Sequence, residues 1–220
     1  MALIAIGDIH GCAKSLDGLL DRLDLSADNT LVFVGDYIDR GPNSKGVIDR
    51  LLKLRTTHDC IFLRGNHERF MLDYLNEGAL NLWSMNGGVA TIQSYQSNSA
   101  TSTEFPSEHV EFVRNTELYY ETDEYFFVHG GLKPQFTIAE NLERFGEDMF
   151  LWERNHLDAD TVAWEKTVVC GHTPRPDPIN RERLIMIDTG CVYDMHPGLG
   201  RLTAVRLPER SFVDVPFQDD

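Results

Sequence analysis

The stretch Gly7-Asp8-Ile9-His10-Gly11, directly after the apolar run from Leu3 to Ile6, shows the pattern on which this fold is organised. A short run rich in β-branched or aromatic residues, ending in glycine and a polar residue, is typical of a strand that ends in a loop. Five more blocks of this kind follow along the chain: Gly35 to Gly41, Gly65 to Glu68, His129 to Gly131, Gly171-His172, and Asp188 to Gly190. Active sites of α/β sheets collect at such strand ends, so we expect the polar residues of these blocks to meet.

The first 65 residues alternate strand and helix, which predicts a parallel start to a sheet. We expect strands at residues 3–6, 31–34 and 61–63, with helices near residues 15–23 and 44–54 and another beginning near Glu68. Residues 68–116 look largely helical, with interruptions at Gly87-Gly88 and the polar run 97–103, and Pro106 is expected to open the last helix.

From Leu118 the pattern changes to pairs of strands. Residues 118–121 and 125–128 flank a connection of hairpin length, and further strands are expected near Thr167, Leu184, Leu202 and Phe212. No linker or internal repeat divides the chain. We therefore expect one domain over residues 1–220, built on a mixed sheet or two packed sheets.

Composition limits the classes of protein to which the chain can belong. The hydrophobic residues make up 42% and the charged residues 25%, which is ordinary for a soluble globular protein. The amino terminus lacks the basic region of a secretion signal, and the four cysteines are widely spaced without a Cys-x-x-Cys pair. We therefore expect a cytoplasmic protein with reduced thiols. The formal charge of -15 argues against nucleic acid as a partner, and no apolar stretch is long enough to span a membrane.

The polar blocks carry metal-ligand chemistry. Asp8 and His10 are two residues apart, so on an extended strand exit both side chains point the same way and can bind one cation. Asp36 arrives from the next strand end, and its second oxygen can bridge to another cation. The second site would be completed by Asn66, His129 and His172. Oxygen and nitrogen ligands suit Mn²⁺, Fe or Zn²⁺, and we expect two divalent ions, Mn²⁺ first.

Two such ions about 3.5 to 4 Å apart would hold one hydroxide between them for direct attack on phosphorus. His67, beside Asn66, is placed to protonate the departing alkoxide, and Asp39 would orient the imidazole. Arg40 and Arg154 would bind the non-bridging phosphoryl oxygens in the bidentate manner of guanidinium groups, together with Asn66. The pattern predicts a metal-dependent phosphoester hydrolase.

Cysteine chemistry is excluded by spacing. A cysteine phosphatase needs an arginine six positions after its nucleophile, and those positions hold Gly18, Asn66, Pro176 and Pro197. The chain also lacks both the Walker pattern and Gly-x-Gly-x-x-Gly.

The first five blocks, from Gly7 to His172, resemble the signature of the phosphoprotein phosphatase family of metal-dependent serine/threonine phosphatases, within the calcineurin-like metallophosphoesterases. The resemblance implies an α/β sandwich of two mixed β-sheets flanked by helices. It also implies the acid pair His67 and Asp39, the phosphate-binding Arg40, and, from the compact bacterial and phage members, Arg154. The metal ligands that it implies are Asp8, His10 and Asp36 for one ion, and Asp36, Asn66, His129 and His172 for the other.

The chain departs from the eukaryotic catalytic subunits, whose Ser-Ala-Pro-Asn-Tyr stretch is replaced here by residues 191–201. It is most similar to the small bacterial protein phosphatases, some of which also accept phosphotyrosine. We therefore expect removal of phosphate from phosphoserine or phosphothreonine, and possible action on phosphotyrosine, with a phosphorylated protein as the partner.

Two alternatives stay open. Symmetrical dinucleoside tetraphosphatases carry similar blocks, including Gly-His-Thr-Pro as at residues 171–174, but typically have Ala at position 39 and Asp at position 68. Asp39 and Glu68 therefore favour the protein phosphatase. An inactive metal-binding scaffold would have lost a ligand or His67, and the chain has lost none. The physiological substrate, the native metal and the oligomeric state are left open.

Overall fold

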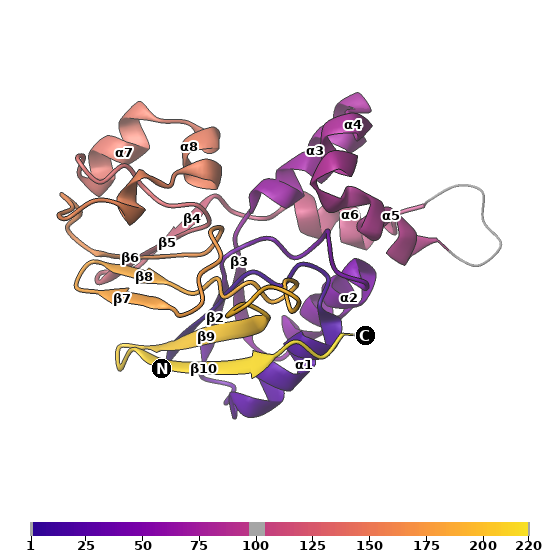
Figure 1. The fold of residues 1–220 in the computed structure, drawn as a ribbon, viewed down its shortest axis with the longest axis horizontal. Helices are drawn as coiled ribbons and strands as arrows, with labels where there is room; N and C mark the ends of the chain where they lie inside the picture. The colour runs from indigo at the N-terminus through magenta and orange to yellow at the C-terminus, as the bar shows by residue number, and fades with distance from the viewer. Residues whose placement is uncertain (1, 97–103, 220) are drawn as a thin grey trace.

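The computed structural model describes residues 2–96 and 104–219, and its strands form two five-stranded sheets that pack face to face (Figure 1). The first sheet has the order β10-β9-β1-β2-β3, with β1 (Leu3–Ile6), β2 (Thr30–Phe33), β3 (Asp59–Phe62), β9 (Arg201–Leu207) and β10 (Ser211–Pro216). The second has the order β4-β5-β6-β8-β7, with β4 (Tyr119–Glu121), β5 (Tyr125–Val128), β6 (Thr167–Cys170), β7 (Ile179–Arg181) and β8 (Leu184–Met186).

Both sheets are mixed. Strands β1, β2 and β3 are parallel because α1 (Ala13–Arg22) and α2 (Ser44–Leu54) carry the chain back between them. The chain returns late to this sheet, with β9 antiparallel to β1 and β10 antiparallel to β9. In the second sheet β5, β6 and β8 are parallel, while β4 and β7 form antiparallel edges.

The alternation of side chains along each strand divides the core into three layers. In β1, Ala5 faces the second sheet while Ile4 and Ile6 face the helices that cover the first sheet. In β5, Phe127 packs between the sheets and Phe126 packs on the outer face of the second sheet. Strands buried on both faces read as nearly continuous apolar runs, which is why the sequence reveals them.

Helices flank the sandwich on both sides (Figure 1). Besides α1 and α2, the first sheet is associated with α3 (Asn66–Glu77), α4 (Leu80–Trp83), the π-turn η1 (Ser84–Gly88), α5 (Val89–Tyr95) and α6 (Ser107–Arg114). The second sheet carries α7 (Ile138–Arg144), α8 (Glu147–Trp152) and the 3₁₀ turn η2 (Asn155–Leu157). Among the described residues, no helix is both long and apolar enough to cross a membrane.

The predicted sandwich of two mixed β-sheets flanked by helices is confirmed. The expected helix at 44–54 and the strands at 3–6 and 125–128 have the predicted bounds, and α6 does begin directly after Pro106. The sequence missed β7, α7 and α8, which are short elements of three to seven residues with too few positions to show a periodicity. The predicted interruption at 97–103 lies outside the described residues.

Candidate active site

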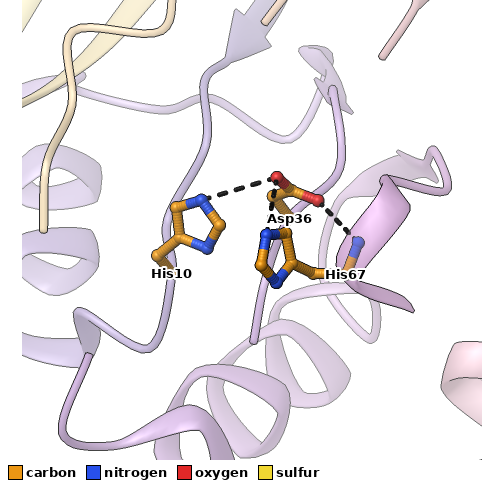
Figure 2. Close-up of side chains that lie close together, drawn as sticks. All are labelled: His10, Asp36 and His67. Carbon is orange, nitrogen blue, oxygen red and sulfur yellow. Dashed lines mark hydrogen bonds and ion pairs between the residues drawn. The ribbon is translucent and has the colours of Figure 1, made fainter. Parts of the chain in front are cut away.

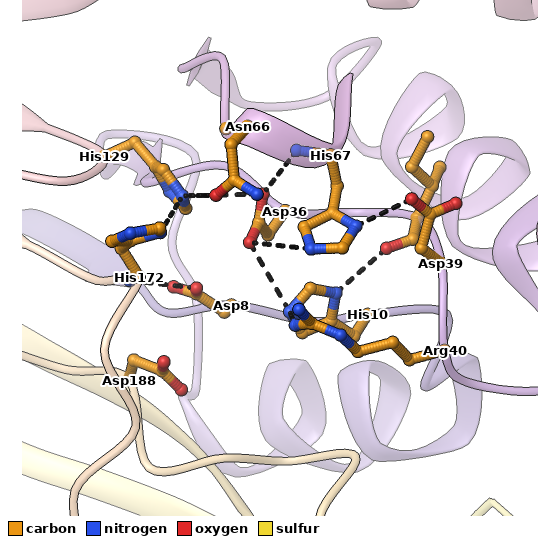
Figure 3. A network of polar contacts seen from close by, with 12 residues as sticks. Asp8, His10, Asp36, Asp39, Arg40, Asn66, His67, His129, His172 and Asp188 are labelled. Atoms are coloured by element: carbon orange, nitrogen blue, oxygen red, sulfur yellow. Dashed lines mark hydrogen bonds and ion pairs between the residues drawn. The ribbon is translucent and has the colours of Figure 1, made fainter. Parts of the chain in front are cut away.

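The polar blocks converge where the strands of the two sheets end (Figure 3). Asp8 and His10 follow β1, and Asp36 follows β2. The remaining ligand candidates are Asn66 and His67 at the start of α3, His129 after β5, and His172 after β6. All of these side chains are buried. Residues separated by more than 160 positions in the sequence thus share one cluster, because each follows a strand whose carboxyl end faces the same side.

The backbone at this cluster is unusual. Five residues without the freedom of glycine have positive φ: His10 at 47°, Asp36 at 53°, Asp39 at 73°, Arg40 at 70° and His172 at 67°. Such conformations cost free energy in non-glycine residues and persist only where surrounding contacts fix them. The loops therefore hold their side chains in positions that an extended strand exit would not give.

Glu68 holds much of this backbone in place through hydrogen bonds. Its carboxylate accepts hydrogen bonds from the backbone N–H groups of Asp36, Tyr37 and Gly65, each at 2.9 Å. Burial, followed by the nearby charge of Asp36, raises the pKa of the Glu68 carboxyl to about 7. Glu68 is thus a buried brace that joins the loop after β2 to the start of α3.

His10, Asp36 and His67 form the first group of potential ligands (Figure 2). His10 donates from Nδ1 to the Ile38 carbonyl at 3.0 Å, which leaves the lone pair of Nε2 facing Asp36 Oδ2 at 3.4 Å. His67 Nε2 lies 4.0 Å from the same oxygen. Burial lowers the pKa of His10 well below its usual range, so its imidazole is neutral and able to bind a cation.

Asp36, His129 and His172 form the second group, next to Asn66. His129 donates from Nδ1 to the Val34 carbonyl at 2.9 Å, so its Nε2 is an acceptor. That nitrogen lies 3.0 Å from Asn66 Oδ1, 3.1 Å from His172 Nδ1 and 3.5 Å from Asp36 Oδ1. Burial lowers the pKa of His129, and it lowers the pKa of His172 to about 2.

These contacts fit the binding of cations. His129 Nε2, Asn66 Oδ1 and Asp36 Oδ1 are all acceptors that face one another, an arrangement that positive charge between them would stabilise. Asp8 Oδ1 and His172 Nε2 are buried without hydrogen-bond partners. Asp36 contributes Oδ2 to the first group and Oδ1 to the second. Nitrogen and oxygen donors of this kind suit two divalent metal ions that share one carboxylate.

Asp8 is not part of the first group as the structure forms it, and His67 takes its place there. Asp8 lies beside the cluster, where its Oδ2 accepts a hydrogen bond from the His172 backbone N–H at 2.9 Å. Burial and the neighbouring carboxylate of Asp188 raise the pKa of Asp8. Asp188 is a buried acid to which the sequence assigned no role, although its Asp-Thr-Gly block marked the position.

The predicted acid pair is brought together. His67 Nδ1 lies 2.7 Å from Asp39 Oδ2, and the same carboxylate accepts from Trp83 Nε1 at 2.9 Å and from Thr91 Oγ1 at 2.6 Å. Burial alone would lower the pKa of His67, but the carboxylates of Asp36 and Asp39 outweigh it and raise that pKa above its ordinary value. The imidazole can thus carry a proton, with Nε2 turned toward Asp36.

The two predicted phosphate-binding arginines flank the cluster on different sides. Arg40 Nη1 lies 2.6 Å from His10 Nε2, and its guanidinium stands 5.6 Å from the centre of the Tyr193 ring. Arg154 donates from Nε to Thr173 Oγ1 at 3.2 Å, next to His172. Its positive charge contributes to the lowered pKa of His172. The sequence singled out Arg154 but not Trp152, which the structure also places at this edge.

Comparison with known proteins places the chain in a family. The calcineurin-like phosphoesterase family matches residues 1–200. The asymmetrical bis(5'-nucleosyl)-tetraphosphatase PrpE of Anoxybacillus flavithermus is 30% identical over 234 residues, covering 96% of this chain and 92% of that one. The PrpE protein of the same description from Oceanobacillus iheyensis is 28% identical, covering 98% of this chain and 92% of that one.

Solved structures share the fold at lower identity. A structure described as that of a "putative diadenosine tetraphosphatase" has a TM-score of 0.74 at 24% identity, covering 100% of this chain and 95% of that one. The protein serine/threonine phosphatase from Saccharomyces cerevisiae has a TM-score of 0.60 at 16% identity, covering 99% of this chain and 80% of that one. The same sandwich therefore occurs in structures that carry either description.

The relatives overturn the expectation of a protein phosphatase, and with it that of a phosphorylated protein as partner. The error lies in the weight given to Asp39 and Glu68, which are buried and bond to His67 and to backbone N–H groups. In this chain both residues support the loops around the cluster, and neither bond involves a group that would contact the substrate beyond its reacting phosphate. The alternative of a dinucleoside tetraphosphatase is better supported, although these relatives are described as asymmetrical, not symmetrical.

The family match over residues 1–200 includes β1, ends directly before β9, and covers every polar block that contributes to the cluster. The donor sets of the cluster suit the divalent ions on which a metallophosphoesterase depends. The chain belongs to the calcineurin-like phosphoesterase family and is a metallophosphoesterase hydrolase.

Proposed function

We propose that this chain hydrolyses dinucleoside tetraphosphates. The observation that carries the proposal is the similarity along nearly the whole chain to proteins named bis(5'-nucleosyl)-tetraphosphatases. The geometry supports it, because two groups of cation ligands share Asp36 and arginines stand at both ends of the cluster. A polyphosphate carries negative charge along its length, so it needs positive charge on both sides of the bond that breaks.

The metal assignment is part of the proposal. Asp8, His10 and Asp36 would hold one ion, and Asp36, Asn66, His129 and His172 would hold the other, with Mn²⁺ as the first metal to test. When bound, the ions supply Lewis-acid chemistry, neutralising phosphoryl oxygens and lowering the pKa of water. We also propose that residues 1–220 form one catalytic domain, because β9 pairs with β1 and so joins the end of the chain to the strand that precedes Asp8.

The other side chains have separate tasks in this proposal. Arg40 and Arg154 bind non-bridging phosphoryl oxygens and align the chain of phosphates. His67 donates the proton on Nε2 to the departing oxygen, while Asp39 holds Nδ1 and keeps the ring oriented. The leaving group of a phosphoanhydride is itself a phosphate, which is far more stable as an anion than an alkoxide. His67 therefore has less work to do here than in hydrolysis of an alkyl phosphate.

The test uses protein stripped of metal and reloaded with Mn²⁺, and compares diadenosine tetraphosphate with a phosphothreonine peptide. Chromatography of the products also locates the attack. Water added at the outer anhydride gives ATP and AMP, whereas water added at the central one gives two molecules of ADP. We expect faster turnover of the dinucleotide, with ATP and AMP as products, and no turnover by Asp36→Asn. Preference for the peptide, or inactivity on the dinucleotide, would overturn the proposal.

A further inference from the structure

The end of α8 brings an aromatic side chain to the edge of the cluster. The Trp152 ring centre lies 5.4 Å from that of His172, with the two planes at 88°, and 5.6 Å from that of Phe70. Phe70 in turn packs at 5.8 Å against His67. Trp152 thus contacts both a proposed metal ligand and a neighbour of the proposed acid. The residue nevertheless remains 38% exposed and lines a cavity, so it is free to meet a ligand.

The position of Trp152 is well fixed. The Gly130 N–H, next to the ligand His129, donates to the carbonyl of Phe150 in α8 at 2.7 Å. A Cβ atom on Gly130 would lie only 2.8 Å from the Trp152 backbone nitrogen, so glycine is what allows α8 to approach. Glu153 then accepts hydrogen bonds from the next two backbone N–H groups at 3.1 and 2.7 Å and pairs with Lys133 at 3.0 Å. These contacts fix the backbone on both sides of Trp152, and the rings of His172 and Phe70 pack against its indole.

A cavity of about 350 Å³ opens beside this indole, and we call it the Trp152 subsite. Its lining combines an aromatic wall, apolar and amide side chains, two cationic side chains and two carboxylates: Trp152, Met149, Asn155, Lys133, Arg154, Asp148 and Glu153. Lys133 is paired with Glu153, whereas Arg154 makes its hydrogen bond to the hydroxyl of Thr173, beside His172. The guanidinium therefore lies between the subsite and the metal-ligand cluster.

We propose that the Trp152 subsite binds one nucleoside of the substrate, an inference that rests on the proposed function. The base stacks on the exposed part of the indole, and Arg154 binds the phosphate that connects this nucleoside to the cluster. Stacking suits the subsite because every base has a π-face, so a nucleoside can be held without hydrogen bonds to its edges. An aromatic wall next to a guanidinium matches the two halves of a nucleotide, the flat base and the charged phosphate.

Binding measurements can distinguish the contribution of the base to the affinity from that of the phosphates. Calorimetry on metal-loaded protein compares ATP with inorganic tripolyphosphate, which carries the same chain of phosphates without a nucleoside. Loss of one stacked base predicts that Trp152→Leu binds ATP about 5- to 150-fold more weakly, with tripolyphosphate affinity unchanged. Trp152→Phe, which keeps an aromatic plane, is expected to retain most of the affinity for ATP. The KM for diadenosine tetraphosphate should rise with Trp152→Leu by a similar factor.

Metal content and tripolyphosphate affinity show whether Trp152→Leu has kept the cluster intact. Equal weakening of both ligands, or no weakening of ATP, would overturn the subsite. The two proposals fail in different ways. If the protein hydrolyses the dinucleotide and Trp152→Leu leaves both the KM and the ATP affinity unchanged, the subsite alone is refuted. Weak binding of ATP by Trp152→Leu in a protein that does not hydrolyse the dinucleotide removes the proposed function and keeps a nucleotide subsite.

Discussion

The site has two regions of opposite character, a buried floor and an exposed rim. The floor holds the ligand candidates and the proposed acid: Asp8, His10, Asp36, Asn66, His67, His129 and His172, all of them buried. The rim holds the exposed side chains around them: Arg40, Trp152 and Arg154. Each floor side chain is set by the strand that it follows or by a buried hydrogen bond, whereas the rim belongs to loops and to the end of a short helix.

The difference shows where specificity for a substrate can arise. In the proposed function the floor would perform chemistry that phosphoesters and anhydrides have in common, so it would not distinguish one substrate class from the other. In that proposal only the rim would meet the part of the substrate beyond the reacting phosphate. Changes in the floor should therefore affect all substrates, and changes in the rim should affect one class more than another.

The largest effect is expected from Asp36→Asn, at the residue that both ligand groups share. Removing the shared charge should release both metals and lower kcat/KM for every phosphate substrate by roughly 10³-fold or more, because each ion contributes several kcal/mol to transition-state stabilisation. Metal analysis and kinetics on two substrates check this. Retention of two metals per chain would contradict the bridging role of Asp36.

His67→Asn should slow substrates to different degrees according to their leaving group, and not according to their contacts with the rim. General acid catalysis contributes about 10²- to 10⁴-fold, so hydrolysis of an alkyl phosphate should slow by that factor. Hydrolysis of diadenosine tetraphosphate should slow less, because its leaving group is a phosphate. Parallel rate measurements at unchanged metal content check this. An equal loss on both substrates would remove His67 from the role of acid and leave it as a ligand, as its place in the first group would allow.

Arg154→Lys probes the rim. Lysine keeps the charge but loses the planar fork, so we expect the KM for the dinucleotide to rise by roughly 10-fold with a small change in kcat. The matched control is Arg144→Lys in α7, whose side chain is exposed and pairs with Glu140 away from the cluster. A fall in kcat with KM unchanged would place the Arg154 contact in the transition state alone.

Glu68→Asp should leave the preference between substrates unchanged, although Glu at position 68 was taken from the sequence to favour a protein phosphatase. The shorter side chain cannot keep all three hydrogen bonds to backbone N–H groups, each at 2.9 Å in the native protein. We expect a loss of about 1–3 kcal/mol in the free energy of unfolding, measured by chemical denaturation. A shift in the rate ratio of dinucleotide to phosphopeptide would contradict the assignment of Glu68 as a brace.

The sequence alone determined the fold and the composition of the floor. Local order accounts for this: an apolar run followed by Gly-Asp or Gly-His specifies both the strand and the residue at its end, and parallel strands deliver their ends to one place. The acid pair His67 and Asp39 was predicted in the same way and lies at 2.7 Å. The grouping of His67 with His10 and Asp36 was not predicted, because it depends on how the loops turn after the strands.

Tertiary structure decided the rest. Trp152 follows no strand and belongs to a helix of six residues, so the pattern that predicted Arg154 two residues later did not single out Trp152 itself. It reaches His172 because Gly130 lets α8 pack against the ligand loop, a contact between segments more than 20 residues apart. Strand ends are fixed by short-range pattern, whereas the rim is fixed by packing between distant segments. The candidate metal ligands could therefore be predicted from the sequence, whereas the proposed nucleoside subsite emerged only from the packed structure.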